Sequence, residues 1–224
     1  VIIWRATRGW GKEQFEADVR RPMVELVTLL CEDMRQFAVD YVPDKPEKAM
    51  YRIYRDTRFS RDKTPYKTHI SAHFQHRRVT RNEGAGFYFQ VSHEGVAVGG
   101  GMYMPGPEQL LAVRQALAQR WQEFARICAD RALVRSLGPF QGDSLARVPK
   151  GFDPQSPAAE WLKRKQLYFY IELDAKLVLG PGIRRAVISR FERVAPMIQF
   201  LNDAIIAGIG SEPEVRPVRP DPMF

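Results

Sequence analysis

Residues 51–67, YRIYRDTRFSRDKTPYK, bring together side chains that can bind an anion. Arginine stays protonated in proteins, and its planar guanidinium donates two parallel hydrogen bonds to a carboxylate or phosphate. Lysine adds a compact positive charge, and tyrosine adds a neutral hydroxyl donor. Over residues 51–82, nine Arg and Lys against two Asp leave an excess of seven positive charges, and the whole chain has a net charge of +8. The surplus charge of the protein is therefore concentrated in this segment.

These arginines need negative partners if they lie against the core, because an unpaired buried charge costs several kcal/mol. In a strand, Arg52, Asp56 and Arg58 share one face while Arg55 lies on the other, so Asp56 pairs with Arg52 or Arg58. Three interpretations remain open: a structural network of ion pairs, a site completed by a bound anion, and solvated surface charge. The acids that a structural network would recruit from elsewhere in the chain are Glu25, Glu32 and Glu172.

The anion-site interpretation assigns a role to most polar residues of the segment. Arginines and Lys63 hold a phosphate or carboxylate, Asp56 orients an arginine, and Tyr66 donates a hydrogen bond beside Pro65 in a turn. Lys150 and Lys165 are secondary candidates. The predicted ligand-binding residues are Arg52, Arg55, Asp56, Arg58, Lys63, Tyr66, Lys150 and Lys165. The sequence names a ligand class, a small anion, but no reaction and no cofactor.

A nucleic-acid or protein interaction surface over residues 52–81 is the alternative function. Arg77, Arg78 and Arg81 extend the basic patch, and Phe74, Phe87 and Tyr88 are aromatic residues able to stack on bases. Such a surface predicts spread, exposed charges and binding that weakens steeply with salt.

Metal and hydrolase chemistry have little support. His69 and His73 would lie on one face of a strand, roughly 13 Å apart, which is too far for one shared ion. No G-x-S-x-G, H-E-x-x-H or paired helical carboxylate motif occurs. We therefore expect no metal site.

Helices are predicted on both sides of a central group of strands. Apolar residues recur every three or four positions over 12–41, with Pro22 either kinking that helix or beginning a second one. A second helix follows Pro107 and extends to Cys128, and a terminal helical pair over 182–207 is expected to break at Pro196.

Strands are predicted for 51–59, 68–77, 86–92, 95–104 and 166–173, with a hairpin turn at His93 and Glu94. Gly99, Gly100 and Gly101 favour a bulge over close approach of another backbone or a ligand. Residues 138–160 form an ordered connecting loop. The sequence thus predicts a single α+β domain over 1–210, a mainly antiparallel sheet flanked by long helices, and a proline-rich tail over 211–224.

Composition sets the broad class. The chain has 224 residues, of which 45% are hydrophobic, enough for one domain without disulfides. No apolar run approaches the roughly 18 residues of a membrane span. Cys31 and Cys128 are interpreted as small buried hydrophobes, and we expect a cytoplasmic protein. The start of the sequence lacks an initiator Met, which indicates that it begins inside a longer chain.

The basic segment resembles the signature R-x-x-R-D-x-R-F-S-x-x-K-x-P-Y of the bacterial and fungal family called domain of unknown function 2461. Supporting similarity covers residues 99–105, 112–117, 149–153 and 195–202, whereas the start keeps only Trp10 and Phe15 of an expected Asn-rich run and Trp-Phe pair. The resemblance implies a domain and a candidate site, because the family has no established biochemical function.

Overall fold

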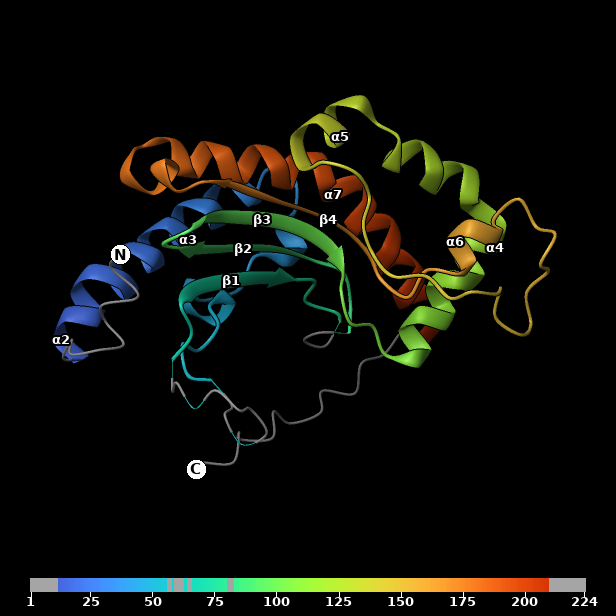
Figure 1. Cartoon of the computed structure of the whole chain (residues 1–224), viewed down its shortest axis with the longest axis horizontal. Helices are drawn as coiled ribbons and strands as arrows, with labels where there is room; N and C mark the ends of the chain where they lie inside the picture. Colours follow the sequence, from blue (N-terminus) through green and yellow to red (C-terminus); the bar gives the residue numbers. More distant parts are fainter. Residues whose placement is uncertain (1–11, 56–57, 59–62, 64–65, 80–82, 210–224) are drawn as a thin grey trace.

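A computed structural model describes residues 12–55, 58, 63, 66–79 and 83–209 (Figure 1). Its elements, in chain order, are α2 (Lys12–Phe15), the π-helical turn η1 (Glu16–Arg20), α3 (Arg21–Met34), the 3-10 turns η2 (Val39–Tyr41) and η3 (Pro46–Ala49), β1 (His69–Gln75), β2 (Gly86–Ser92), β3 (Gly95–Met102), α4 (Pro107–Cys128), α5 (Arg131–Leu137), α6 (Ala159–Leu162), β4 (Leu167–Asp174), the 3-10 turn η4 (Ala175–Leu179) and α7 (Gly182–Ile209). The fold is the predicted α+β class.

The four strands form one antiparallel sheet in the order β1-β2-β3-β4. Ser92 fixes the predicted hairpin between β2 and β3, because its hydroxyl accepts hydrogen bonds from the amides of Glu94 and Gly95. The expected strands at 68–77, 86–92, 95–104 and 166–173 are confirmed to within two residues at each end.

Helix α7 covers one face of the sheet, and α3, α4 and α5 pack on α7 (Figure 1). The Phe191 ring of α7 lies 5.1–6.5 Å from the ring centroids of Phe74, Phe87 and Phe89, which project from β1 and β2. All four phenylalanines are at most 1% exposed. Large apolar side chains between one helix and the sheet therefore form the centre of the core.

Glycine is required in β3 because a helix lies close to it. A Cβ atom on Gly100 would lie 2.7 Å from Ile198 Cδ1 and 2.8 Å from Val194 Cγ1 of α7. Strand pairing runs without interruption from Gly99 to Gly101 on both sides of β3. The predicted bulge is wrong; close approach of neighbouring groups explains the glycines.

The predicted break at Pro196 is also wrong, since α7 is one helix from Gly182 to Ile209. Proline costs a helix interior about 3 kcal/mol through its missing amide and its ring. Val194 and Ile198, on either side, are completely buried, and burying such side chains contributes about 1.5–3 kcal/mol each. Packing on the sheet thus outweighs the local preference of one residue.

Pro22 lies in the first turn of α3. This agrees with the predicted alternative in which Pro22 begins a second helix. The turns of α2, η1 and α3 follow one another without a gap, and α3 ends at Met34. The prediction of helix as far as residue 41 is wrong, because the chain turns there through η2.

Both edges of the sheet carry short additional pairings. Beside β1, Met50 bridges Ala72 and the Tyr51 amide donates to the Ser71 carbonyl at 2.9 Å. Beside β4, the Gln141 amide donates to the Tyr168 carbonyl at 2.9 Å and its side-chain amide to the Tyr170 carbonyl at 2.7 Å.

The expected strand over 51–59 is only partly realised in its described residues, 51–55 and 58. They contain an isolated bridge from Tyr54 to Tyr66 and a hydrogen bond from the Lys67 amide to the Ile53 carbonyl at 2.8 Å, not a continuous ladder. Cys31 and Cys128 are free and buried, as predicted. Among the described helices, none has the length and apolar character needed to cross a membrane.

Candidate ligand-binding face of the sheet

Strand alternation separates the apolar face beneath α7 from a face that carries polar and aromatic side chains. We call the second the polar face. Across the four strands, one row consists of His73, Tyr88, Gly99 and Tyr170, and the next of Ser71, Gln90, Ala97 and Glu172. Gln75 and Tyr168 begin and end a third row, with Gly86 and Gly101 between them.

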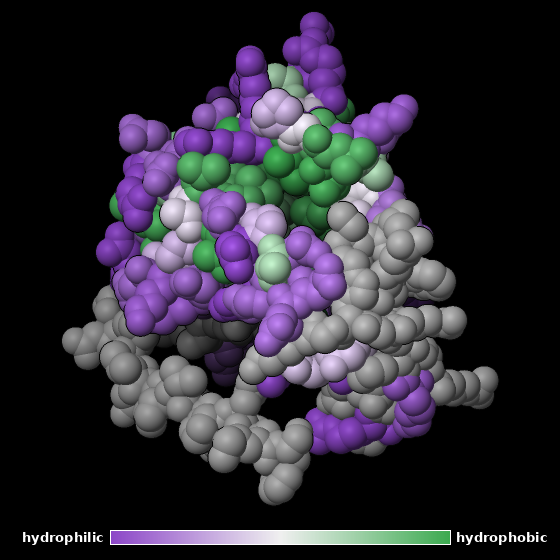
Figure 2. All heavy atoms as spheres, turned by 90° about the vertical axis from the view of Figure 1, so that its left-hand side faces the viewer, coloured by the Kyte–Doolittle hydropathy of each residue, from purple (hydrophilic) through white to green (hydrophobic). Residues whose placement is uncertain are grey.

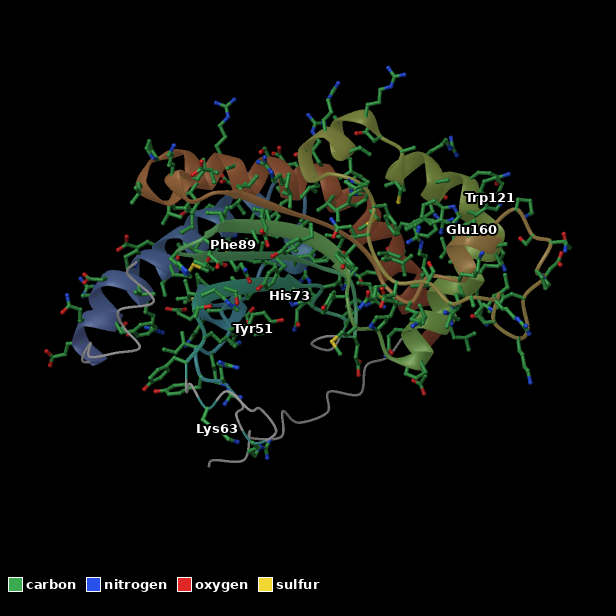
Figure 3. All side chains as sticks on the ribbon, in the orientation of Figure 1. Tyr51, Lys63, His73, Phe89, Trp121 and Glu160 are labelled. Atoms are coloured by element: carbon green, nitrogen blue, oxygen red, sulfur yellow. The ribbon has the colours of Figure 1, made fainter. Side chains whose placement is uncertain are left out.

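The polar face meets the 51–67 segment at an aromatic cluster beside β1. The Tyr51 ring stacks on His73 at a centroid distance of 6.2 Å and lies 6.4 Å from the Tyr88 ring. Lys67 Nζ is 5.4 Å from the centre of the Tyr51 ring, within reach of a cation–π interaction. Figure 3 shows Tyr51 beside His73 and Lys63 further out from the sheet. The cluster joins strands β1 and β2 to the basic segment.

The tyrosines of this face are held in their neutral, hydrogen-donating form. The Tyr88 hydroxyl donates to Gln90 Oε1 at 2.7 Å. Burial raises the pKa of Tyr88 to about 12, although a hydrogen bond with Ser71 acts in the opposite direction. Burial also raises the pKa of Tyr168 and of Tyr170. Neutral phenols at physiological pH donate to an anion without repelling it.

Glycines lie beneath the rings and fix their orientation. A Cβ atom on Gly86 would lie 2.3 Å from His73 Nε2, and one on Gly99 would lie 3.1 Å from Tyr170 Cδ2. Gly101 has φ +131° with the Tyr168 side chain against it. These contacts are sufficient to explain why glycine occupies the three positions. They also hold the His73, Tyr168 and Tyr170 side chains in fixed orientations, which is what preorganisation of a binding site requires.

The predicted cationic residues belong to the segment that follows Tyr51, which pairs with the β1 edge of this face. Arg52, Arg58 and Lys63 are exposed and Arg55 is half-buried. Each of the four has an interaction partner. Glu32, one of the distant acids considered for a network, lies 3.9 Å from Arg184 instead. The edge supplies positive charge close to the neutral donors.

Comparison with known proteins identifies the family. The sequence matches the model of the family described as conserved hypothetical protein (DUF2461) over residues 7–200. The chain belongs to the DUF2461 family. No functionally curated protein and no solved structure matches it. The expected resemblance to this family is confirmed. Because a fold does not determine a function, any function has to be inferred from the residues of the site.

Not all of the predicted DUF2461 site residues come together. Tyr66 contacts Tyr54, with 5.3 Å between ring centroids, beside the basic segment. Asp56 lies outside the described residues. Lys150 and Lys165 are exposed and belong to the chain that leads into and out of α6, at the far end of the molecule from the 51–67 segment in Figure 1. They are separate from the polar face.

Metal binding and base stacking are the two other kinds of chemistry considered for this DUF2461 protein. Within the described ranges, no group of three or more His, Cys, Asp or Glu is arranged to hold a metal ion. Phe74 and Phe87 are 1% and 0% exposed, which confirms the usual interpretation of alternating strand aromatics as core residues and excludes them as base-stacking residues of the alternative function. They belong to the core, with Tyr88 on the opposite face.

Sequence reasoning missed most of the polar face. Tyr51, His73, Gln90 and Tyr170 were not among the predicted ligand-binding residues, and Tyr88 was considered only for base stacking. The signal was present in the alternation of polar and apolar residues along 69–75, 86–92 and 167–173. Strand order and register are needed to show that these polar positions share one face.

A different surface of the molecule is apolar. Figure 2 shows apolar residues gathered at the end where α7 begins, and Leu179 in η4, 84% exposed, belongs to this end. Val178 beside it is 39% exposed.

Proposed function

We propose that the polar face, together with the 51–67 edge, binds a small ligand that carries a phosphate or carboxylate group. The observation that carries this proposal is the junction at Tyr51, His73, Tyr88 and Lys67, where neutral donors adjoin a concentration of positive charge. Hydrogen bonds to a charged group are worth about 1.5–3 kcal/mol, twice those between neutral groups.

The donor set favours an anion over a cation. The Tyr88 hydroxyl can turn its O–H from Gln90 to an anion, and the basic side chains of the edge are donors only. The acid of the second row, Glu172, lies on β4, away from β1. Glu172 is exposed in the second row, where it would repel an anion placed over β4. The ligand is therefore placed over β1 and β2, beside Tyr51.

Thermal unfolding with inorganic phosphate, pyrophosphate and a dicarboxylate tests the proposal. A ligand at a hundred times its dissociation constant stabilises a protein by about 2.7 kcal/mol, which raises the melting temperature measurably. In the unliganded structure the single O–H of Tyr88 is donated to Gln90, so binding requires it to turn to the anion. Tyr88→Phe keeps the ring and removes this hydroxyl, so we expect about a tenfold or greater loss of affinity.

Tyr103→Phe is the matched control, because Tyr103 is 62% exposed and lies beyond the end of β3. It should leave affinity unchanged. Arg52→Gln should weaken binding more at low salt than at high salt, since it removes a charge from an exposed edge. Equal affinities for the wild type and Tyr88→Phe, or no stabilisation by any of the three anions, would contradict the proposal.

A nucleic-acid surface is a second candidate, favoured by one observation. Tyr54 is 64% exposed between Arg52 and Arg55, an arrangement suited to stacking on an unpaired base. Titration with single-stranded DNA at several salt concentrations separates the two functions. A steep loss of affinity with salt, abolished by Tyr54→Ala and unaffected by Tyr88→Phe, would favour the nucleic-acid surface.

A further inference from the structure

A groove runs along α7 on the other side of the sheet from the polar face. It comprises two neighbouring hollows of about 460 and 300 Å³ that share Gln199. From α7 they are lined by residues spaced three or four apart, Glu192, Ala195, Pro196, Gln199, Asp203, Ile206 and Ala207. One face of the helix is thus available to a partner over four turns. We call this surface the α7 groove.

The floor of the α7 groove is aromatic. Phe37 and Tyr41 pack edge-on against Phe87, with ring centroids 6.2 and 5.1 Å apart. All three line the smaller hollow. Tyr41 and Phe87 are 3% and 0% exposed, so the half-buried Phe37 is the ring of this floor that a proline can contact. Shallow grooves with exposed aromatic rings suit extended, proline-containing peptides.

The walls of the α7 groove are acidic on a protein of net charge +8. Asp40, Asp203 and Glu192 line it together with Arg78, and Asp40 is already paired with Arg77, so Asp203 and Glu192 are the acids best placed to recognise a cationic segment. Asp203 accepts a hydrogen bond from Gln199 at 2.7 Å and still has a free carboxylate oxygen position for another donor. Pro196 has no amide hydrogen, so the Glu192 carbonyl loses its donor within the helix and adds an acceptor to the groove wall.

The chain itself contains a segment of matching chemistry. Residues 215–220, VRPVRP, place Arg216 and Arg219 each directly before a proline, within a tail of four prolines in fourteen residues. Pro217 and Pro220 have the P-x-x-P spacing that docks in aromatic grooves as a polyproline II helix. Glu212 and Glu214 come earlier in this tail.

Length and connection allow this segment to reach the groove. Ile206 and Ala207 line the larger hollow, and α7 ends at Ile209. Residues 211–224 span roughly 43 Å as polyproline II, whereas residues 192–207 of the helix extend roughly 22 Å. We propose that residues 211–224 fold back and dock in the α7 groove of the same chain, with Arg216 and Arg219 paired to its acids and the prolines on its aromatic floor.

Disulfide trapping in the full chain tests this docking. Gln199→Cys is combined with Val218→Cys, which lies between the two arginines. The native thiols do not interfere, because Cys31 and Cys128 are buried and burial raises their pKa to about 11 and about 12. A docked tail forms an intramolecular disulfide about tenfold faster than a freely tethered one, since docking raises the effective concentration.

Leu111→Cys with Val218→Cys is the matched control pair. Leu111 is 48% exposed and adjoins Ala112, which lies against Gly208 at the end of α7, so a freely moving tail reaches it as readily. Equal rates for the two pairs would overturn the proposal. A disulfide-linked dimer in place of the intramolecular product would overturn the assignment to the same chain.

Charge variants of the Gln199→Cys, Val218→Cys protein test the ion pairs. Arg216→Glu with Arg219→Glu should slow trapping at least several-fold, and Arg216→Lys with Arg219→Lys should restore most of the rate. Asp203→Lys should partly rescue the charge-reversed tail. Trapping that is insensitive to all of these changes would show that the acids of the groove do not recognise the arginines.

Discussion

Neighbouring residues of β2 serve two surfaces of opposite character. Tyr88 belongs to the polar face, where neutral donors adjoin the basic 51–67 edge, whereas Phe87 forms part of the floor of the α7 groove, which acids line. Strand alternation sends the two side chains to opposite sides of the sheet. A net charge of +8 therefore describes neither surface, because basic residues are concentrated beside one face of the sheet and three acids line the groove on the other.

The largest expected loss of folding stability comes from a substitution beside the α7 groove. Asn202 is completely buried and donates to the Tyr41 hydroxyl at 2.9 Å and the Ala85 carbonyl at 2.8 Å, and it accepts from the Ala85 amide at 2.9 Å. Asn202→Ala leaves these groups without partners and should cost roughly 3 kcal/mol or more. Urea unfolding measures this, with the exposed Gln199→Ala as control. Equal stabilities would show that the network does not hold the groove floor.

A second substitution tests the separation between the sheet and α7. Gly100→Ala should cost about 1–3 kcal/mol because the new methyl group overlaps Ile198 and Val194. Ile198→Val and Val194→Ala should partly rescue it, as measured by thermal unfolding. Gly180→Ala is the control, since nothing lies within 4 Å of its Cβ position. A tolerated Gly100→Ala without rescue would mean that the helix shifts easily.

The two surfaces each contain one tyrosine with a strongly raised pKa. Burial raises the pKa of both Tyr88 and Tyr41 to about 12. Because the neutral form is favoured in the folded state, this stabilisation is complete below the ordinary pKa of about 10 and is lost as pH rises through the folded value. Phenolate absorbance during alkaline titration should show Tyr88 and Tyr41 among the late tyrosines, in addition to Tyr168 and Tyr170, whose pKa values burial also raises. Tyr88→Phe and Tyr41→Phe should each remove one late tyrosine.

A bound anion should make the two tyrosines titrate differently. It should delay ionisation of Tyr88 further, since a phenolate beside the ligand would be repelled, and leave Tyr41 unchanged. An equal delay of both tyrosines would place the anion elsewhere.

The smallest expected change in stability concerns an ion pair that lies outside both surfaces. Arg184 donates two hydrogen bonds of 2.8 Å to Asp33, linking α7 to α3. These hydrogen bonds hold the pKa of Asp33 below its ordinary value. The stabilisation is therefore present above that ordinary value and is lost as pH falls through the lowered one. Asp33→Asn should slightly reduce stability at pH 7 and not at low pH, with Asp44→Asn as the exposed control. A loss that is the same at every pH would contradict an ion-pair origin.

The sequence predicts the elements well where local pattern and packing agree. The stripe from Leu110 to Cys128 gave a helix, and the alternation over 86–92 gave a strand, with nearly correct ends. Prediction failed at Pro196 and at Gly99–Gly101, where tertiary packing determines the outcome. A proline can remain inside a helix when its neighbours are buried, and glycines can lie in a regular strand when a helix packs against them.

The candidate site was only half predictable for a related reason. The basic residues Arg52, Arg55, Arg58 and Lys63 are adjacent in sequence, so composition alone revealed them. His73, Tyr88 and Tyr170 come from three strands, with 97 positions between His73 and Tyr170, and pairing register places them in one row. A single histidine or tyrosine in a strand does not indicate a site. These three become a candidate site only because they share one face of the sheet.

The pairing of Met50 and Tyr51 beside β1 also bears on solubility. An open sheet edge presents unpaired amides and carbonyls to any other chain, which promotes aggregation through added strands. Met50 and Tyr51 shield part of this edge of β1, as Gln141 shields part of that of β4. Shortening the loop that carries the family signature would therefore expose a template for strand addition. Such variants are expected to precipitate at high concentration even while their core remains intact.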